Sequence, residues 1–324
     1  MLENFSLNLL PILLLATPSL ILPLHTHIAL RGRPSYLSLL NLCLGLQTPL
    51  NPRTWNDGEY PACAAMTTGY IFRVENQATV MFLQRIGRTA HLLTLEVSPP
   101  KSPSPASISI STAALPTIIL LSQIAFSFSS TSTSLNLTLA LLLTSRLLIT
   151  ITLRSRTLPT WHGAPEPNVK GDLLILVSED RWVRLKGLVD DLKAVTSGSW
   201  LSSPPHPKLM DALDWISQML VYLAVVVLAN ASDSEKVMLV GTVTASHLLL
   251  MYENSRAETL VMHGRTVKLS EEKGSVKKYG RRLEMADELV KEMGRSDFAV
   301  RLGMINPEQA KKSNDDASSE VVTM

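Results

Sequence analysis

The chain has 324 residues with a mean hydropathy of +0.17, and only 18% of its residues are charged. These values argue against two ordinary soluble domains and favour a protein that resides in a membrane. A net charge of +2 at pH 7 gives no reason to expect nucleic acid as a partner. The two cysteines, Cys43 and Cys63, exclude a disulfide framework and fit no cysteine metal motif.

Residues 1–30 are expected to form an N-terminal transmembrane anchor. Residues 7–28 are mostly apolar, and the segment before them carries Glu3 but no Lys or Arg, unlike a cleaved secretory signal. Three prolines kink the run, and Arg31 and Arg33 give it a positive flank on its C-terminal side. We therefore expect the N-terminus on the non-cytoplasmic face.

Residues 31–107 form a poorly defined cytoplasmic segment that ends in a linker rich in Pro and Ser. Its stretch 36–50, beginning at Tyr36, is apolar but short, which suits a re-entrant or interfacial position. Beyond it lie turn signals, an alternating patch at 79–88 and an apolar run at 91–97. This pattern fits either a small module or a disordered segment.

Four further apolar runs predict two transmembrane hairpins. A membrane span needs about 20 helical residues to cross a hydrocarbon core of about 30 Å. The runs pair across short polar turns, so each pair is expected to form two antiparallel helices, within 108–153 and 212–252. The four runs are residues 108–128, 135–153, 212–229 and 237–252.

The loop 154–211 is predicted to be cytoplasmic and to contain an amphipathic helix. Ser178 is a suitable N-cap, and Gly198 ends the pattern. Between them, apolar residues recur at spacings of three and four from residue 182 to residue 195. The apolar stripe consists of Trp182, Leu185, Leu188, Val189, Leu192 and Val195.

Residues 253–305 are predicted to form a cytoplasmic helical tail. A helix from Arg281 to Met293 has an apolar stripe and stops at Gly294, and a second short helix begins near Ser296. Residues 306–324 are polar and are expected to be disordered.

The distribution of basic residues assigns the two faces of the membrane. Lys and Arg gather in the long segments, and the positive-inside bias therefore places those segments and the C-terminus in the cytoplasm. The basic residues nearest the helix ends are Arg154, Arg156, Lys208 and Arg256. Three acceptor motifs for N-glycosylation, at Asn4, Asn136 and Asn230, fall on the opposite face. The sequence thus predicts a mainly α fold, a multi-pass helical membrane protein with two transmembrane hairpins, an N-terminal anchor and cytoplasmic amphipathic helices.

Two blocks of the C-terminal half carry a resemblance. They are WHGAPEPNVKGDLLILVSEDRWVRLKGLVDDLKAVTSGSW at residues 161–200 and KKYGRRLEMADELVKEMGRSDFAVRLGMI at residues 277–305. This half resembles a group of uncharacterised multi-pass membrane proteins of filamentous ascomycete fungi. The resemblance implies paired helices between the two blocks and a fungal origin, and it carries no assigned activity.

The sequence contains no common phosphate-binding loop, zinc-protease motif or nucleophile elbow. No catalytic, cofactor or metal site is therefore predicted. His25 and His27 form half of a metal site at most, and an interfacial pair at a helix end explains them more simply. Asp211 and Asp214 share a helix face, but a metal-diphosphate site would need several more acids.

Ionisable groups at membrane depth are costly, about 2.5–3.5 kcal/mol on insertion scales, and mark candidate sites. Arg146, Asp214, His247 and Glu253 are the candidate intramembrane polar site. For Arg146 a structural role is preferred, in which it snorkels part way to the cytoplasmic end or pairs with Asp214. For His247, contact with a partner helix is preferred over a proton relay or metal site with Glu253.

Two classes of function fit these patterns. The first is a non-catalytic scaffold or accessory protein whose helices at 182–195 and 281–293 bind a cytoplasmic partner or the bilayer surface. The alternative is a membrane-embedded enzyme or transporter of a lipophilic small molecule, built around the intramembrane polar residues. The first class is preferred because the predicted spans contain few polar groups and no internal repeat.

Overall fold

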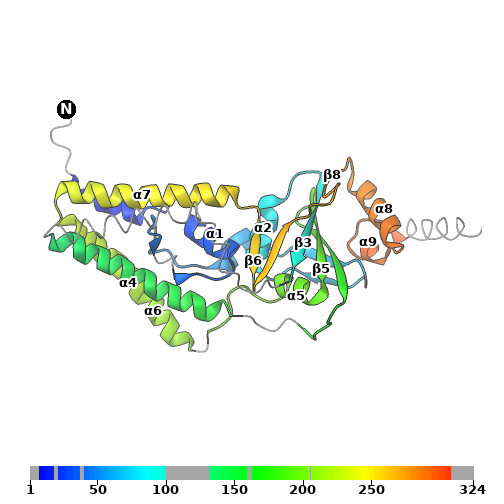
Figure 1. Ribbon diagram of the computed structural model, residues 1–324, viewed down its shortest axis with the longest axis horizontal. Coiled ribbons are helices and arrows are strands. Elements are labelled where there is room, and N and C mark those ends of the chain that lie inside the picture. Colours follow the sequence, from blue (N-terminus) through cyan, green and yellow to red (C-terminus); the bar gives the residue numbers. More distant parts are fainter. Residues whose placement is uncertain are drawn as a thin grey trace, which may run out of the picture. The chain divides into compact units, whose positions relative to one another are not determined.

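A computed structural model describes residues 7–17, 21–36, 40–99, 132–158, 163–204 and 206–307 of the chain (Figure 1). The chain divides into two compact units. The helical unit comprises Met1–Pro52, Pro103–Leu158 and Leu201–Ala257. The α/β unit comprises Arg53–Ser102, Pro159–Trp200 and Glu258–Met324.

The helical unit is built around three long helices, α4 (Thr133–Arg156), α6 (Pro207–Ala229) and α7 (Asp233–Arg256). The shorter helices η1 (Leu7–Leu15) and α1 (Pro23–Leu30) pack against α7, and η1 also contacts α6. The sequence accounts for the helix ends. Pro207 opens α6 at a position where its missing N–H is not needed, and a capping box of Ser232 and Glu235 opens α7.

Among the described helices, α4 and α6 form the most extensive pair, and they run antiparallel. The Ser145 hydroxyl donates to the Ser217 carbonyl at 2.7 Å, and seven residues further along α4 the Thr152 hydroxyl donates to the Asp214 carboxylate at 2.7 Å. Short hydroxyl side chains at the interface let the two backbones approach closely, as in helix pairs within membranes.

The α/β unit contains an eight-stranded mixed sheet with the order β2-β1-β4-β5-β3-β7-β6, in which β8 also pairs with β3. Only the β3–β5 pair among these ladders is parallel. The strands are β1 (Ala62–Ala65), β2 (Ile71–Arg73), β3 (His91–Ser98), β4 (Lys170–Leu176), β5 (Arg181–Leu188), β6 (Leu260–Met262), β7 (Arg265–Leu269) and β8 (Val276–Lys278).

Helices cover both faces of this sheet. On one face, α8 (Arg282–Met293) and α9 (Asp297–Arg301) bury Met285, Leu289 and Phe298 against Trp182 and Leu174 of the sheet. On the other face lies α5 (Val189–Thr196). The helix α2 (Gln77–Ile86) lies beside α5, and the Thr79 hydroxyl of α2 donates to the Val195 carbonyl at 2.7 Å. A short η3 helix (Pro52–Gly58) precedes β1.

The prediction of a mainly α, multi-pass fold is wrong, because about half of the described chain builds this sheet and its covering helices. Within the described ranges, two helices are long and apolar enough to cross a membrane, α4 and α6. The N-terminal run forms η1 and α1, each shorter than a span, and α7 contains too many charged, Ser and Thr residues to qualify. The expected span at 108–128 lies outside the described residues.

The predicted cytoplasmic helices also need correction. Residues 182–188 form most of β5, so the expected helix at 182–195 exists only as α5. The region 31–107 contains β1, β2, α2 and β3, and the alternating patch at 79–88 lies largely in α2. The tail 253–305 is not wholly helical, because the strands β6, β7 and β8 precede α8. The helix predicted from Arg281 to Met293 is confirmed as α8, which begins at Arg282 and ends at Met293. The second helix is confirmed, since Ser296 is the N-cap of α9.

Candidate functional site

A groove of about 620 Å³ lies on the face of the sheet that α5 partly covers. This volume falls within the range of pockets that bind small molecules or peptide side chains, roughly 300–1,000 Å³. Its lining comes from the β1–β2 hairpin, from β4 with the segment before it, and from α5 with the residues that follow it. The groove is therefore shared by three distant segments of the chain.

Side chains at the floor and wall make the groove largely apolar. Ala65 and Leu173 are register partners on β1 and β4 and form part of the floor. Tyr70 and Phe72 stack with ring centroids 6.1 Å apart and form an aromatic wall along β2. Leu192 of α5 also borders the groove. Tyr70 is 65% exposed, so this wall offers a large apolar surface to a ligand.

Close contact between α5 and the sheet fixes the inner border of the groove. Gly171 of β4 lies so near α5 that an added Cβ would come within 2.7 Å of Leu192 and 3.0 Å of Val189. A side chain at position 171 would therefore require the side chains of Leu192 and Val189 to shift. Gly171 thus allows these two residues of α5 to pack closely against β4.

The β1–β2 hairpin is anchored by residues around α9. Arg295 donates to the Thr67 carbonyl, and Arg301 donates to the Gly69 carbonyl at 2.9 Å. Gly69 has a φ of +71° and lies against the Asp297 carboxylate, where a Cβ would come within 1.8 Å. These contacts hold β2 and its aromatic side chains in a defined position.

Behind the groove, a buried ion network ties the sheet to α8. Arg184 of β5 donates to both carboxylate oxygens of Asp172 at 2.9 Å or less, and to both oxygens of Glu292 at 2.7 Å. Burial alone would lower the pKa of Arg184, but the hydrogen bonds with Glu292 and Asp172 raise it. The same Arg184 contacts hold the pKa of Glu292 below its usual range. Arg184 thus stays charged and joins the two layers.

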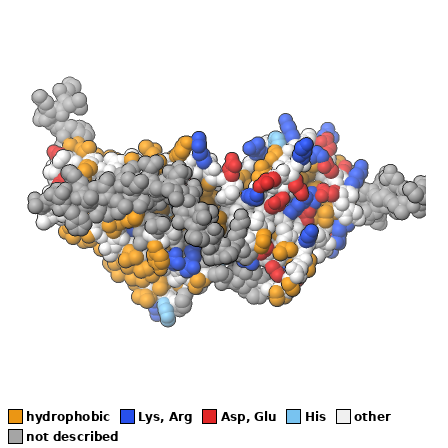
Figure 2. Space-filling view, in the orientation of Figure 1, with side chains coloured by type: hydrophobic (Ala, Val, Ile, Leu, Met, Phe, Trp, Pro, Cys, Tyr) orange, Lys and Arg blue, Asp and Glu red, His pale blue; other side chains and the backbone are white. Residues whose placement is uncertain are grey.

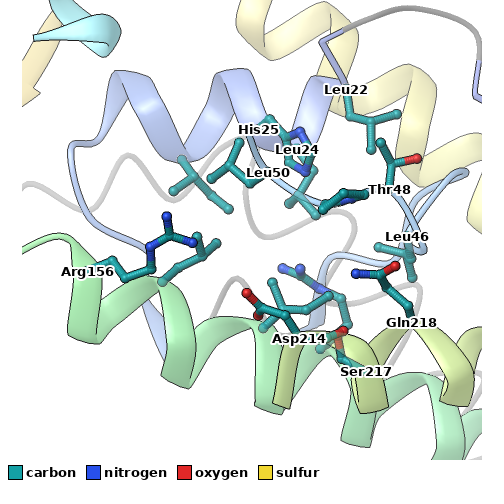
Figure 3. A pocket seen from close by; sticks show the side chains of 15 residues that line it. Leu22, Leu24, His25, Leu46, Thr48, Leu50, Arg156, Asp214, Ser217 and Gln218 are labelled. Atoms are coloured by element: carbon teal, nitrogen blue, oxygen red, sulfur yellow. The ribbon is translucent and has the colours of Figure 1, made fainter. Parts of the chain in front are cut away.

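The helical unit contains a second, much smaller cavity of about 30 Å³ between α1, α4 and α6 (Figure 3). Arg146 and Asp214, two of the predicted intramembrane residues, both border it, together with His25 and Arg156. Arg146 is only 1% exposed. The structure therefore brings Arg146 and Asp214 to one place, while the Asp214 carboxylate accepts a hydrogen bond from Thr152.

The other two predicted residues lie elsewhere, on α7. His247 is buried within the helical unit, and Glu253 lies 3.7 Å from His27 of α1. Next to Glu253, the Asn254 amide donates to the Pro23 carbonyl at 2.6 Å. Glu253 therefore has a neighbour that the sequence did not suggest, and the hydrogen bond of the adjacent Asn254 joins α7 to α1.

The remaining sequence candidates take structural positions. Asn136 lies in the first turn of α4, and Asn230 caps the C-terminus of α6, while Asn4 lies outside the described residues. Cys43 and Cys63 are both buried free thiols. Among the described residues, no group of His, Cys, Asp and Glu is arranged to hold a metal ion.

Sequence reasoning missed the groove because its three segments meet only through strand pairing. One local signal was available, since His263 and Gly264 form a two-residue turn between β6 and β7 with φ values of 48° and 81°. Such a turn with both φ values positive is typical of a β-hairpin. It would have identified strands in the tail.

Comparison with models of protein families, with curated proteins and with solved structures finds no match to this chain.

Proposed function

We propose that the protein is a non-catalytic, membrane-anchored binding protein. The helical unit anchors the chain in a lipid bilayer, and the α/β unit carries the binding surface on the cytoplasmic side. The observation that carries this proposal is the inverted polarity of α4 and α6. Both helices expose large apolar side chains, and they bury the polar residues Ser145, Arg146 and Ser217 beside apolar ones.

The inversion is clearest on α6. From Trp215 to Val226, the exposed positions are occupied by large apolar side chains, with Trp215 and Val226 each 61% exposed. Its interior holds Ser217, which is 1% exposed. The exposed members of this apolar face are Trp215, Ile216, Met219, Tyr222, Leu223 and Val226. A helix surrounded by water exposes polar side chains instead, so this apolar face is suited to contact with lipid.

The same inversion occurs on α4, where Arg146 and Ser145 are buried while Leu147 and Ile151 are exposed. Figure 2 shows hydrophobic side chains gathered over the part of the molecule where α4 and α6 lie, and charged side chains gathered over the α/β unit. A contiguous apolar surface of this kind is typical of membrane contact.

The ends of the helices favour the topology expected from the sequence. Because α4 and α6 are antiparallel, Arg154 and Arg156 lie at the same end of the pair as Lys208. The chain leaves the helical unit for the α/β unit after Leu158 and returns at Leu201, both beside this basic end. The positive-inside bias then assigns the basic end and the α/β unit to the cytoplasm.

The binding surface differs from the two helices expected on sequence grounds. The apolar residues of α5 and α8, including Leu192 and Leu289, are buried in the core of their own unit. A partner would therefore meet other parts of the α/β unit. The groove beside β2, with a volume of about 620 Å³, is a concave surface of this unit that a partner could enter.

The alternative of an enzyme or transporter for a lipophilic molecule draws little support from the helical unit. The cavity beside Arg146 measures about 30 Å³, which suits about one water molecule, whereas ligand pockets measure roughly 300–1,000 Å³.

Alkaline carbonate extraction of isolated membranes, combined with protease protection of a C-terminal tag, tests the proposal. We expect the chain to stay in the membrane pellet and the tag to be digested in sealed vesicles whose cytoplasmic face is outward. Release of the chain by carbonate would contradict the anchor. A protected tag would contradict the topology, and glycosidase-sensitive sugar on Asn136 or Asn230 would support it.

A further inference from the structure

We propose that the outer edge of β2, which pairs with no strand in the described part of the chain, binds an extended peptide segment of a partner protein, one that alternates apolar and acidic residues. The peptide would add a strand to the sheet beside the groove. This inference rests on the binding role proposed for the α/β unit and names the class of partner.

Strand β2 lies at one end of the sheet order, with β1 as its neighbour. The Ala65 N–H donates to the Tyr70 carbonyl at 2.8 Å, and the Val74 N–H donates to the Pro61 carbonyl at 3.1 Å. Hydrogen-bonded and non-hydrogen-bonded pairs alternate in an antiparallel ladder. The backbone N–H and C=O groups of Phe72 therefore point toward β1, as the bonded groups of Tyr70 and Val74 do. The backbone N–H and C=O groups of Ile71 and Arg73 consequently point away from the sheet.

An exposed strand edge is a template for another strand, and short anchored edges of this kind bind peptides by strand addition. The contacts of Arg295 and Arg301 with the hairpin hold the β2 edge before a peptide arrives. This order lowers the conformational entropy that binding would otherwise cost.

The groove selects the side chain opposite Phe72. A residue directly opposite on an added strand lies on the same face of the sheet, with Cβ atoms about 4.5–5.5 Å apart. Phe72 and Tyr70 border the groove, so the peptide residue opposite Phe72 would pack against their rings at the rim of the groove. An aliphatic side chain such as Val fits this position.

The charges around the groove select the neighbouring peptide residue. Arg73 and Lys170 are exposed there. Three acids border the groove in the described chain. Asp172 is paired with Arg184, and Glu166 is paired with Lys193. Glu75 is then the remaining acid against the two cations Arg73 and Lys170. An acidic side chain opposite Arg73 would therefore find a complementary charge.

A fluorescein-labelled hexapeptide that alternates Glu and Val is the probe, and a Lys and Val hexapeptide is its charge-reversed control. Binding to the full chain in detergent micelles is measured by fluorescence anisotropy. We expect the acidic peptide to bind and the basic peptide to bind at least about 10-fold more weakly, since like charges repel across a strand pair. Equal affinity for the two peptides would overturn the charge assignment.

Three variants separate the charge from the edge. Arg73→Gln removes the charge and should weaken binding about twofold to fivefold. Arg73→Pro also removes the outward N–H, which a free edge tolerates, and should weaken binding by about 10-fold or more. Arg88→Gln makes the same charge change in the loop after α2, away from the groove, and should leave binding unchanged.

Amide hydrogen exchange supplies the readout that a merely structural effect would not give. Peptide binding should slow exchange at Ile71 and Arg73. If Arg73→Pro binds the peptide normally, or if these two amides stay unprotected, the proposal is wrong. If the apolar dye anilinonaphthalene sulfonate fills the groove while neither peptide binds, the proposal is also wrong and the groove is a small-molecule site. The membrane anchor, tested by carbonate extraction, would be unaffected.

Discussion

The two units of this chain differ in the side chains that they expose, although both have an apolar interior. The α/β unit has an apolar core, and its buried cation, Arg184, is matched by two carboxylates. The helical unit buries Ser145, Arg146 and Ser217 and exposes Leu147 and Trp215. This difference supports the proposal that α4 and α6 lie in lipid while the sheet lies in water.

The strongest test of the α/β side of this comparison is Arg184→Met. The change leaves the buried Asp172 carboxylate without its cation, and breaking a buried pair typically costs about 3–5 kcal/mol. We expect a loss of that size in the free energy of unfolding, measured by urea titration of tryptophan fluorescence in micelles. The double variant Arg184→Met with Asp172→Leu should regain part of this stability, because it removes the orphaned charge as well. A single variant as stable as the wild type would show that the network contributes nothing.

The strongest test of the helical side is Leu147→Lys. Leu147 is 41% exposed, so a lysine there would be neutral in water, but at the centre of a membrane helix it costs about 2.5–3.5 kcal/mol of insertion free energy. We expect reduced insertion of α4 in a glycosylation-reporter assay. Val261→Lys is the matched control on β6, where Val261 is 37% exposed. It should change stability by less than about 0.5 kcal/mol. If both lysines are tolerated equally, the two units do not differ in their surroundings.

A smaller effect is expected from Gly69→Ala in the hairpin that carries the groove wall. Gly294, at the end of α8, has a φ of +65° close to the +71° of Gly69, but no described atom lies within 4 Å of the point that an added Cβ would occupy. Gly294→Ala should cost about 1–2 kcal/mol from left-handed backbone strain alone. Gly69→Ala should cost more, because it also displaces Asp297. Equal melting temperatures for the two variants would contradict the contact with Asp297.

The smallest effect concerns pH. The pKa of Glu292 is lowered in the folded protein by Arg184, so this carboxylate contributes stability above its ordinary value of about 4.5. That contribution is lost as the pH falls through the lowered pKa. Unfolding of the α/β unit, followed by tryptophan fluorescence, should therefore become easier in acid below about pH 4.5. Glu292→Gln should reduce this dependence, and an unchanged acid profile in that variant would exclude Glu292 as a contributor.

The long helices could be predicted from the sequence because their signal is local. The runs at 135–153 and 212–229 fall within α4 and α6, and the polar turn at Asn230 separates α6 from α7. Length and hydropathy alone decide such elements. Length and hydropathy could not predict the packing partners of α7, which is long but less apolar than α4 and α6.

The sheet could not be predicted because its central strands are buried on both faces. In β5, the four successive residues from Trp182 to Leu185 are all buried, so the alternation that identifies a half-exposed strand is missing. The same residues happen to fit a helical spacing. The sequence placed Arg184 on the polar face of a predicted helix. Its two acidic partners, Asp172 and Glu292, lie in other elements and could not be recognised from local spacing.

The candidate site divides in the same way. The proximity of Arg146 and Asp214 follows from their depth in two predicted spans, and both do border one cavity. The groove depends on register between β1, β2 and β4, which no local pattern encodes.

The order of strands in the sheet has a consequence for the synthesis of the protein. Strand β3 ends at Ser98, but its neighbours β5 and β7 end at Leu188 and Leu269, after α4 and after α7 respectively. During synthesis, both edges of β3 therefore stay unpaired by β5 and β7 while the long helices are made. The apolar stretch from Leu92 to Val97 is exposed to aggregation throughout that interval. The time needed to make the helices thus sets how long this strand stays unpaired on the nascent chain.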